Sequence, residues 1–508
     1  MQPQISFDRT VITTRNDEVV NVLIELTAPP APEIERKPLD IVLVLDRSGS
    51  MGGQPLDSVT KAAAQLLRLV GASDRIGVVA FDDEVNLVLP LGQHDPTSAG
   101  RTVRAITAGG STNLSGGWLK GLEMLLADVR EDALRRIIVL TDGHANAGIT
   151  TPDELLALVG GGRARDVSTS CIGFGDGYDE RLLAGLADAG HGNDYWCAGP
   201  DQAAAVFADE FAGLASVVAQ NVSVEIKPSA AVAVAKVLNE FPITDLASGG
   251  VQVALGDAYG GETRKVVARF HLRPVAADGA LDVATLTFRW ASTVGEVSLH
   301  TVTVPVRVTV GDEGAQDPDA DPRVHEEVLV LEVARTRREA RDAAEIGDYQ
   351  AASALLRESA TTLACMVAPP QGDLEDLRLD VERLESGHWD SASSKKLFSR
   401  SRSSSRGRKT NYEDTPENPL WARPETPLHP PVILSLWTPT QPTTHRRRPQ
   451  PTPPHTSPCP LPPGRRPTSS TSPVRPPASP RSGAVSPSTW TTSSRGSCCA
   501  SQQMSPGS

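Results

Sequence analysis

Between residues 40 and 218, short runs of β-branched residues alternate with segments of helical periodicity. This alternation is typical of strands joined by crossover helices in a mainly parallel sheet. We therefore expect an α/β, doubly wound domain over residues 38–218. Its expected strands are Ile41–Leu45, Arg75–Phe81, Val85–Leu91, Arg136–Thr141 and Val167–Phe174. The expected helices include Leu114–Asp128, Pro152–Val159, Asp179–Ala189 and Asp201–Val218, the last two capped by their aspartates.

The strand Val85–Leu91 follows its predecessor after only three residues. A parallel neighbour needs a crossover of a dozen residues or more, so this short connection predicts an antiparallel edge strand. Another apolar face at helical spacing, from Val59 to Val70, predicts a helix between the first two strands.

The residues on either side of this domain have different patterns of apolar and polar side chains. Residues 219–315 alternate apolar and polar side chains between Gly and Asp breaks, which predicts an antiparallel β-sandwich. Residues 1–37 have the same period, and we expect them to pair with it, so that the α/β domain is an insertion. Residues 324–390 return to helical periodicity, with a Gly347-Asp348 turn between two helices and a third helix after them. We interpret these helices as a packing or oligomerisation element.

Residues 391–508 predict a disordered, low-complexity tail rich in Ser, Pro, Thr and Arg. Their net charge is +12, with 16 Lys and Arg against 4 Asp and Glu. Three interpretations remain open: a basic tail that touches nucleic acid or acidic partners, an inert tail, or a segment translated in the wrong reading frame. Codon third-position bias separates the last of these from the others.

Charge and cysteine usage limit the class of protein. Residues 1–390 carry a net charge of −25, which argues against a folded part that binds nucleic acid. The six cysteines are scattered without CxxC spacing, as expected in a reducing compartment. Charged residues near the N-terminus interrupt any signal-peptide core, and no apolar run approaches 18 residues. These features predict a cytoplasmic protein without a membrane span.

Polar side chains gather where the expected strands end. Asp46 ends the first strand and is followed by Ser48 and Ser50 at alternate positions; Thr112 follows a Gly109-Gly110 pair; Asp142 ends the strand Arg136–Thr141. Loops at the carboxyl ends of parallel strands converge at one edge of the sheet, where ligands bind. Two carboxylates and three hydroxyls form an all-oxygen set that suits Mg²⁺ or Mn²⁺. The alternative for the DxSxS stretch alone is a turn in which these side chains cap backbone amides.

The motifs "DRSGS" at Asp46–Ser50, "GGSTNL" around Thr112 and "TDG" around Asp142 resemble the three loops of the von Willebrand factor A domain, a Rossmann-like fold. The resemblance covers about residues 38–218 and implies a metal-ion-dependent adhesion site. By this likeness, five residues would coordinate the metal, some of them through water, and a carboxylate of a partner protein would complete the coordination sphere. The five are Asp46, Ser48, Ser50, Thr112 and Asp142.

An oxygen-ligand metal site of this kind fits two classes of function, an enzyme and a binding module. A metal-dependent hydrolase would need a general base or an activated nucleophile, and the chain has neither a GxSxG elbow nor an HExxH motif. It also has no GxxxxGK[ST] loop, so a role in ATP-driven work would be that of a regulatory subunit of a separate ATPase. We favour a non-enzymatic adaptor or scaffold that binds an Asp or Glu of another protein, with no small-molecule substrate.

Three further residues near the loops have expectations of their own. His144 is expected to be a solvent-facing loop residue, and Trp118 to belong to the core. Arg47 is expected either to contact an acidic partner at the rim of the site or to be an exposed spacer.

Overall fold

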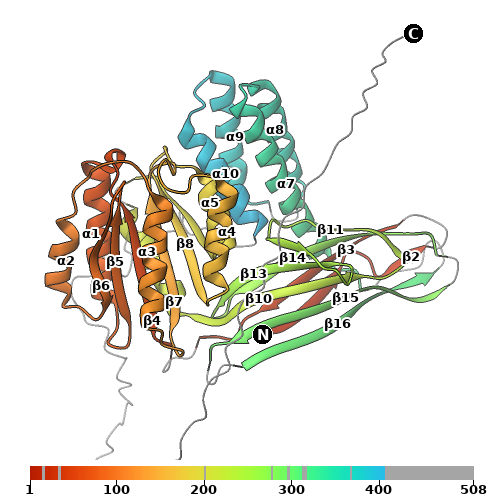
Figure 1. The fold of residues 1–508 in the computed structure, drawn as a ribbon. Helices are drawn as coiled ribbons and strands as arrows, with labels where there is room; N and C mark the ends of the chain where they lie inside the picture. The colour runs from red at the N-terminus through yellow and green to blue at the C-terminus, as the bar shows by residue number, and fades with distance from the viewer. Residues whose placement is uncertain are drawn as a thin grey trace, which may run out of the picture. The chain divides into compact units, whose positions relative to one another are not determined.

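The computed structural model describes residues 1–406 apart from 14–17, 32–35, 200–201, 276–277, 295–297, 312–316, 318 and 367–368. Figure 1 shows three kinds of structure along this chain: an α/β part, a part made of long antiparallel strands, and a group of helices near the C-terminal end of the described chain.

The α/β part is built on a six-stranded sheet in the order β6-β5-β4-β7-β8-β9. All neighbours are parallel except β6, which pairs antiparallel with β5 at the edge as expected. The chain adds strands on one side of β4 and then returns to add the rest on the other side. The strands are β4 (Leu39–Asp46), β5 (Arg75–Phe81), β6 (Val85–Gly92), β7 (Leu134–Thr141), β8 (Val167–Phe174) and β9 (His191–Cys197).

Helices cover both faces of this sheet. One face packs against α1 (Gln54–Leu69), α2 (Pro96–Arg104) and α6 (Ala203–Ala215). The other packs against α3 (Leu114–Ala127), α4 (Pro152–Arg163) and α5 (Glu180–Ala189). The confirmed fold class is therefore a doubly wound α/β fold with a mixed, mainly parallel sheet.

The central strand β4 is apolar without interruption from Ile41 to Leu45 because it is covered on both faces. Ile41, Leu43 and Leu45 point into the core under α1, whereas Val42 and Val44 point into the core under α3. Because successive side chains of a strand face opposite sides, a strand covered on both faces must be apolar at every position. Every residue of β4 is buried, including Asp46 at its end.

Within the α/β part, one helix and one strand were not predicted, and the ends of two helices were wrong. The sequence did not predict α2 or β9, whose segments contain few periodic apolar residues. The helix expected over Pro152–Val159 continues to Arg163. The helix expected over Asp201–Val218 ends at Ala215, because Val217 and Val218 already belong to the next strand. Asp179 caps α5 as expected, with its carboxylate accepting a 2.9 Å hydrogen bond from the amide of Leu182. The expected cap Asp201 lies outside the described residues.

Two further sheets are mainly antiparallel. One has the order β1-β3-β14-β11, and the other β12-β13-β10-β15-β16-β2. Strands before the α/β part thus pair with strands after it: β3 lies beside β14 over ten residue pairs. The strands are β1 (Gln2–Phe7), β2 (Val11–Thr13), β3 (Glu18–Thr27), β10 (Val217–Pro228), β11 (Val232–Val237), β12 (Ile243–Asp245), β13 (Val251–Tyr259), β14 (Thr263–Leu272), β15 (Gly279–Ser292) and β16 (Ser298–Gly311).

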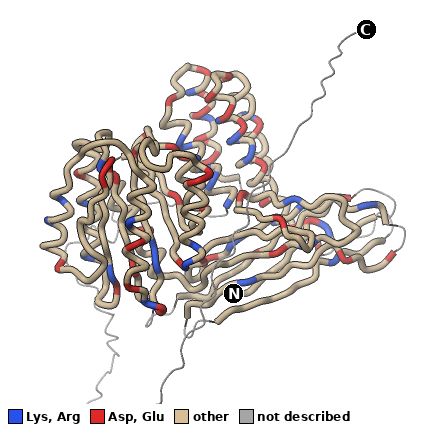
Figure 2. Tube along the Cα trace, in the orientation of Figure 1, with Lys and Arg blue, Asp and Glu red and all other residues tan. Residues whose placement is uncertain are grey.

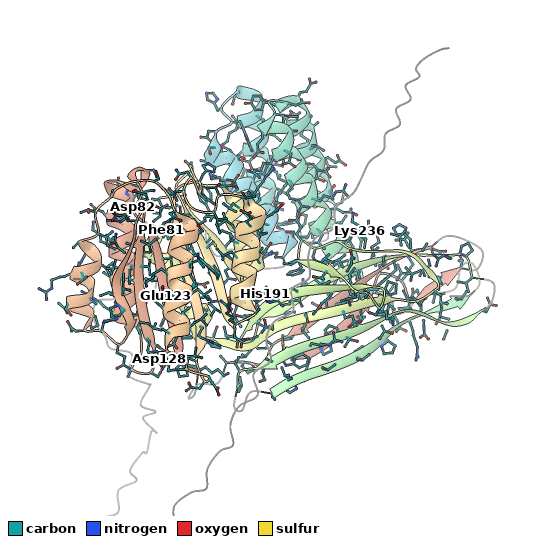
Figure 3. All side chains as sticks on the ribbon, viewed as in Figure 1. Phe81, Asp82, Glu123, Asp128, His191 and Lys236 are labelled. Atoms are coloured by element: carbon teal, nitrogen blue, oxygen red, sulfur yellow. The ribbon has the colours of Figure 1, made fainter. Side chains whose placement is uncertain are left out.

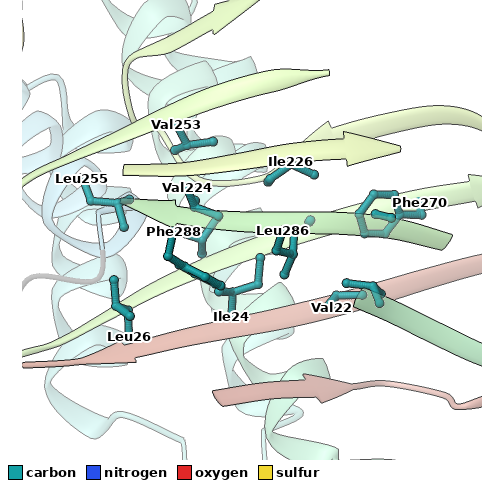
Figure 4. Close-up of a cluster of buried hydrophobic side chains, with 14 of the residues drawn as sticks. Val22, Ile24, Leu26, Val224, Ile226, Val253, Leu255, Phe270, Leu286 and Phe288 are labelled. Atoms are coloured by element: carbon teal, nitrogen blue, oxygen red, sulfur yellow. The ribbon is translucent and has the colours of Figure 1, made fainter. Parts of the chain in front are cut away.

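The facing sides of these two sheets share one apolar core. Val22, Ile24 and Phe270 come from the four-stranded sheet, and Val224 and Phe288 from the six-stranded sheet (Figure 4). All five are at most 1% exposed. This shared core ties the N-terminal strands to strands more than 190 residues later in the chain, with the α/β part between them.

Four helices complete the described chain: α7 (Pro322–Glu345), α8 (Tyr349–Ala364), α9 (Gln371–Ser386) and α10 (Ser391–Ser405). The first three and the turn at Gly347 agree with the expectation, and acidic and basic residues are interspersed along the group (Figure 2). The prediction of a disordered tail from residue 391 was wrong for residues 391–405. These residues form α10, whose Lys and Arg side chains are paired with acids elsewhere in the chain.

The remaining expectations for the tail lie outside the described residues, which end at Arg406. Among the helices that the structure describes, none is both long and apolar enough to cross a membrane.

Candidate functional site

Three loops meet at the carboxyl end of the α/β sheet. They follow β4 (residues 47–53), precede α3 (residues 105–113) and follow β7 (residues 142–151). Backbone hydrogen bonds join them: the amide of Gly49 donates to the carbonyl of Gly110 at 3.1 Å, and that of Asn146 donates to the carbonyl of Thr112 at 3.1 Å. The segments are thus held together by the backbone, independently of any ligand.

The five predicted site residues converge there. Ser50 Oγ donates to Asp142 Oδ1 at 2.8 Å and lies 3.2 Å from Ser48 Oγ. Asp46 Oδ1 accepts from the amide of Ser48 at 2.7 Å. Thr112 Oγ1 faces the same point, because a Cβ added to Gly143 would lie 3.3 Å from it and 4.0 Å from Ser50 Oγ.

The five site residues range from buried to exposed. Asp46, Ser48 and Thr112 are at most 3% exposed, Asp142 is half-buried and Ser50 is exposed. The site therefore has a buried inner side within the protein and an outer side that reaches the surface.

The carboxylates of Asp46 and Asp142 are not balanced by a basic side chain of the described residues. Burial, and then the nearby charge of Asp142, raise the pKa of Asp46 above its ordinary value; hydrogen bonds from Thr141 and Ser48 only partly oppose this. Burial also raises the pKa of Asp142. In the described part of the chain no Lys or Arg forms an ion pair with either carboxylate, and Arg47 pairs with Asp82 instead, at 3.1 Å.

These observations fit a hard divalent cation. Buried carboxylates are normally paired with a charge or bound to a metal. The two carboxylates and three hydroxyls offer oxygen donors of the kind that Mg²⁺ and Mn²⁺ prefer. The described residues hold no group of three or more His, Cys, Asp or Glu side chains placed to bind one metal ion, so a cation here would depend on the hydroxyls as well as the acids.

Several residues that support the site were not predicted from the sequence. Thr141 Oγ1 donates to Asp46 Oδ2 at 2.5 Å and accepts from the amide of Gly143 at 3.1 Å. Asn146 Oδ1 accepts from the amide of Thr112 at 2.6 Å. Thr141 could have been found as the last residue of β7, since it lies beside Asp46 at the carboxyl edge.

A second pair of acids also supports the loops. Asp82 follows Phe81 at the end of β5 (Figure 3), and Asp83 Oδ1 accepts from the amide of Ser111 at 3.1 Å. Because these acids approach the loop so closely, a Cβ at Gly109 would lie 2.4 Å from Asp82 Oδ2, and one at Gly110 would lie 1.3 Å from Asp83 Oδ1. The Gly109-Gly110 pair is therefore explained by space rather than by flexibility. In the sequence, the run "DDE" directly after a buried strand could have indicated these supporting acids.

The three neighbouring residues have clear positions. Trp118 is a core residue, 2% exposed, with its indole N–H donating to Thr169 Oγ1 at 3.0 Å, and His144 is exposed, as expected. The expectation that Arg47 is an exposed spacer was wrong, because its side chain is only 19% exposed and pairs with Asp82.

Comparison with known proteins identifies the domain that carries this site. Residues 40–215 match the von Willebrand factor type A domain. The chain is 27% identical over 362 residues to the uncharacterized protein sll0103 of Synechocystis sp., covering 69% of this chain and 84% of that protein. Further curated relatives are matched over only 18% to 37% of their own length.

Solved structures share the fold at low sequence identity. A von Willebrand factor type A protein from Catenulispora acidiphila superposes with a TM-score of 0.62 at 17% identity, over 78% of this chain and 96% of that one. The ArnB paralog VWA2 from Sulfolobus acidocaldarius gives a TM-score of 0.54 at 17% identity, over 80% and 98%. Residues 40–215 of this chain are therefore a von Willebrand factor type A domain.

Proposed function

We propose that this chain is a protein-binding adaptor or scaffold whose binding depends on Mg²⁺ or Mn²⁺. The metal would be held in a metal-ion-dependent adhesion site by Asp46, Ser48, Ser50, Thr112 and Asp142, some of them acting through water. The observation that carries the proposal is the meeting of two carboxylates with three hydroxyls at one edge of the sheet, where no Lys or Arg of the described residues pairs with either carboxylate.

A divalent cation would remove the electrostatic cost of this arrangement. Both carboxylates have raised pKa values, mainly through burial, so their charged forms are disfavoured in the metal-free protein. Two carboxylates just neutralise a divalent ion, and hydroxyl ligands add no charge. The bound ion would therefore keep its attraction for a further anionic oxygen.

The gradient of burial suggests where that oxygen comes from. Asp46, Ser48 and Thr112 form the buried side, whereas Ser50 is exposed. A coordination position on the exposed side can be reached by a side chain of another protein. We infer that the partner supplies an Asp or Glu carboxylate, since hard cations prefer anionic oxygen.

Binding is favoured over catalysis because neither Asp46 nor His144 is well placed to act as a general base. Asp46 is 0% exposed and is held by hydrogen bonds from the amide of Ser48 and from Thr141 Oγ1, so a substrate has no direct access to this carboxylate as a general base. His144, the imidazole on these loops, is directed toward Asp179, with 3.9 Å between Nδ1 and Oδ2.

Selection of peptides on the full-length protein tests this proposal. A random peptide library would be bound in Mg²⁺ and eluted with EDTA, with an Asp142→Ala variant as the matched control. We expect enrichment of Asp or Glu at one position for the wild type only. Equal enrichment on the variant, or none on either protein, would contradict the proposed mode of binding.

A further inference from the structure

Helix α10 contacts the α/β part beside the candidate metal site. Its residues Ser391 and Lys395 lie on the segment 175–180, which connects β8 to α5. We propose that these contacts, here called the α10 clasp, position the Asp142 loop and thereby set the affinity of the site for a divalent metal. This inference rests on the proposed function, because it concerns the same metal site.

The segment 175–180 touches the Asp142 loop directly. Gly177 lies against the backbone there, because a Cβ at this position would be 3.2 Å from the carbonyl oxygen of Asp142. Asp179 Oδ2 lies 3.9 Å from Nδ1 of His144, two residues further along the loop. A displacement of this segment toward the site would therefore collide with the peptide group that carries Asp142.

Lys395 contacts the same segment. Its ammonium donates to the carbonyl of Tyr178 at 2.7 Å, pairs with Glu180 Oε2 at 2.5 Å and lies 4.1 Å from the centre of the Tyr178 ring. The side chain is only 4% exposed. A lysine buried to this degree is stable only with its full set of partners, so the contacts fix the position of the segment closely.

Three contacts of Ser391 and Arg341 hold the same elements together. Ser391 Oγ donates to the carbonyl of Asp176 at 2.9 Å. Arg341 of α7 pairs with Glu180, and its guanidinium lies 4.9 Å from the centre of the Phe398 ring of α10. The clasp thus joins α7, α10 and the loop beside the metal site through contacts in the described structure.

The energetic consequence follows from the sensitivity of metal sites to ligand position. Loss of an outer contact that orients a ligand typically costs about 10- to 100-fold in metal affinity. The clasp acts through one intervening segment, so we expect an effect near the lower end, about tenfold. Because coupling between two sites is reciprocal, metal binding should also protect α10 from local opening.

The test compares two lysines that are adjacent in α10. Lys395→Met removes the charge of the clasp but keeps an unbranched apolar stem. Lys396→Met is the matched control, because Lys396 pairs with Asp376 of α9, at 3.4 Å. Mn²⁺ affinity would be measured by calorimetry on both full-length variants and the wild type, together with their unfolding temperatures.

We expect about tenfold weaker Mn²⁺ binding for Lys395→Met and unchanged binding for Lys396→Met. Equal affinities in both variants and the wild type would overturn the clasp while leaving the metal site intact. A wild type that binds no Mn²⁺ would instead overturn the proposed function, and the clasp with it.

A second measurement needs no variant and decides the matter even if Lys395→Met does not fold. Amide hydrogen exchange of residues 391–405 in the wild type would be compared with and without saturating Mg²⁺. Slower exchange with Mg²⁺ supports the coupling. Identical exchange in a protein that demonstrably binds Mg²⁺ contradicts it.

Discussion

Ser50 and Asp142 are 92 residues apart in the chain, yet Ser50 Oγ donates a 2.8 Å hydrogen bond to Asp142 Oδ1. The bond joins the loop after β4 to the loop after β7, two strands that run side by side in the sheet. It satisfies one oxygen of a carboxylate whose charge no Lys or Arg of the described chain balances.

Replacing Thr141 by Val should weaken metal binding about tenfold, the lower end of the effect of losing a ligand-orienting contact. The substitution removes the hydroxyl that donates to Asp46 Oδ2 and accepts from the amide of Gly143. Calorimetry with Mn²⁺ measures the change. Thr141→Ser is the control and should retain most of the affinity, because it keeps the hydroxyl. Wild-type affinity in Thr141→Val would refute a positioning role for Thr141.

The stability of the metal-free protein should depend on pH through Asp142. Burial raises its folded-state pKa above the ordinary value of 3.8, so between these two pKa values the native state binds more protons than the unfolded state. The wild type should therefore lose stability relative to Asp142→Asn as the pH rises through this window, and the difference should be constant above it. Urea unfolding of both proteins at a series of pH values tests this. A difference that stays constant across the window would argue against the burial effect.

Saturating Mg²⁺ should reverse that loss in the wild type only. A ligand at 100 times its dissociation constant stabilises the native state by about 2.7 kcal/mol. We expect a rise in unfolding temperature for the wild type and none for Asp142→Asn, with Na⁺ at equal ionic strength as the control. An equal rise in both proteins would indicate that Mg²⁺ acts elsewhere.

Two glycine substitutions should have opposite effects. A Cβ at Gly110 would displace Asp83 from its hydrogen bond to the amide of Ser111, so Gly110→Ala should lower the free energy of unfolding by about 1 kcal/mol. Gly160 lies inside α4 with nothing within 4 Å of an added Cβ, so Gly160→Ala should raise it by about 0.5–1 kcal/mol. Denaturant unfolding measures both changes, and a stabilising Gly110→Ala would disprove the close approach of Asp83.

Ending the chain at Asp390 should destabilise it relative to a chain that ends at Arg406. The shorter chain loses α10, including Ser401, whose Oγ donates to the carbonyl of Ala334 at 2.6 Å, and Arg402, which pairs with Asp188 and Asp194. It would also leave Asp188, Asp194 and Glu180 without basic partners on α10. We expect a loss of about 3 kcal/mol in the free energy of unfolding, the size typical of breaking partly buried ion pairs. Equal stability would show that α10 contributes nothing to the fold.

The sequence predicted those elements whose stability is local or purely apolar. The strands β4, β5 and β7 each contain a continuous apolar run. Asp46 and Asp142 lie where the neighbouring strands β4 and β7 end, so topology alone brings them together. What the sequence could not show depends on polar tertiary partners. Strand β9 is one example, because its buried Asn193 depends on a tertiary partner: the side-chain amide donates a 2.8 Å hydrogen bond to Glu210 of α6.

Helix α10 is the second example. Its sequence is rich in Ser and Arg and lacks apolar periodicity, which is typical of a disordered linker. Its Lys395 and Arg402 nevertheless find acidic partners on β9 and α5, and these could not be identified before the fold was known. Supporting residues such as Thr141 were missed for the same reason, because their role depends on the neighbouring strand.

The most direct test of the metal site is calorimetric titration of the full-length protein with Mg²⁺ and Mn²⁺, beside the double variant Asp46→Ala, Asp142→Ala. Circular dichroism would establish that the variant keeps its fold. We predict binding of one ion per chain in the wild type and none in the folded variant. A wild type that binds neither ion, or a variant that binds them equally well, would contradict the metal site and the adhesion function proposed for it.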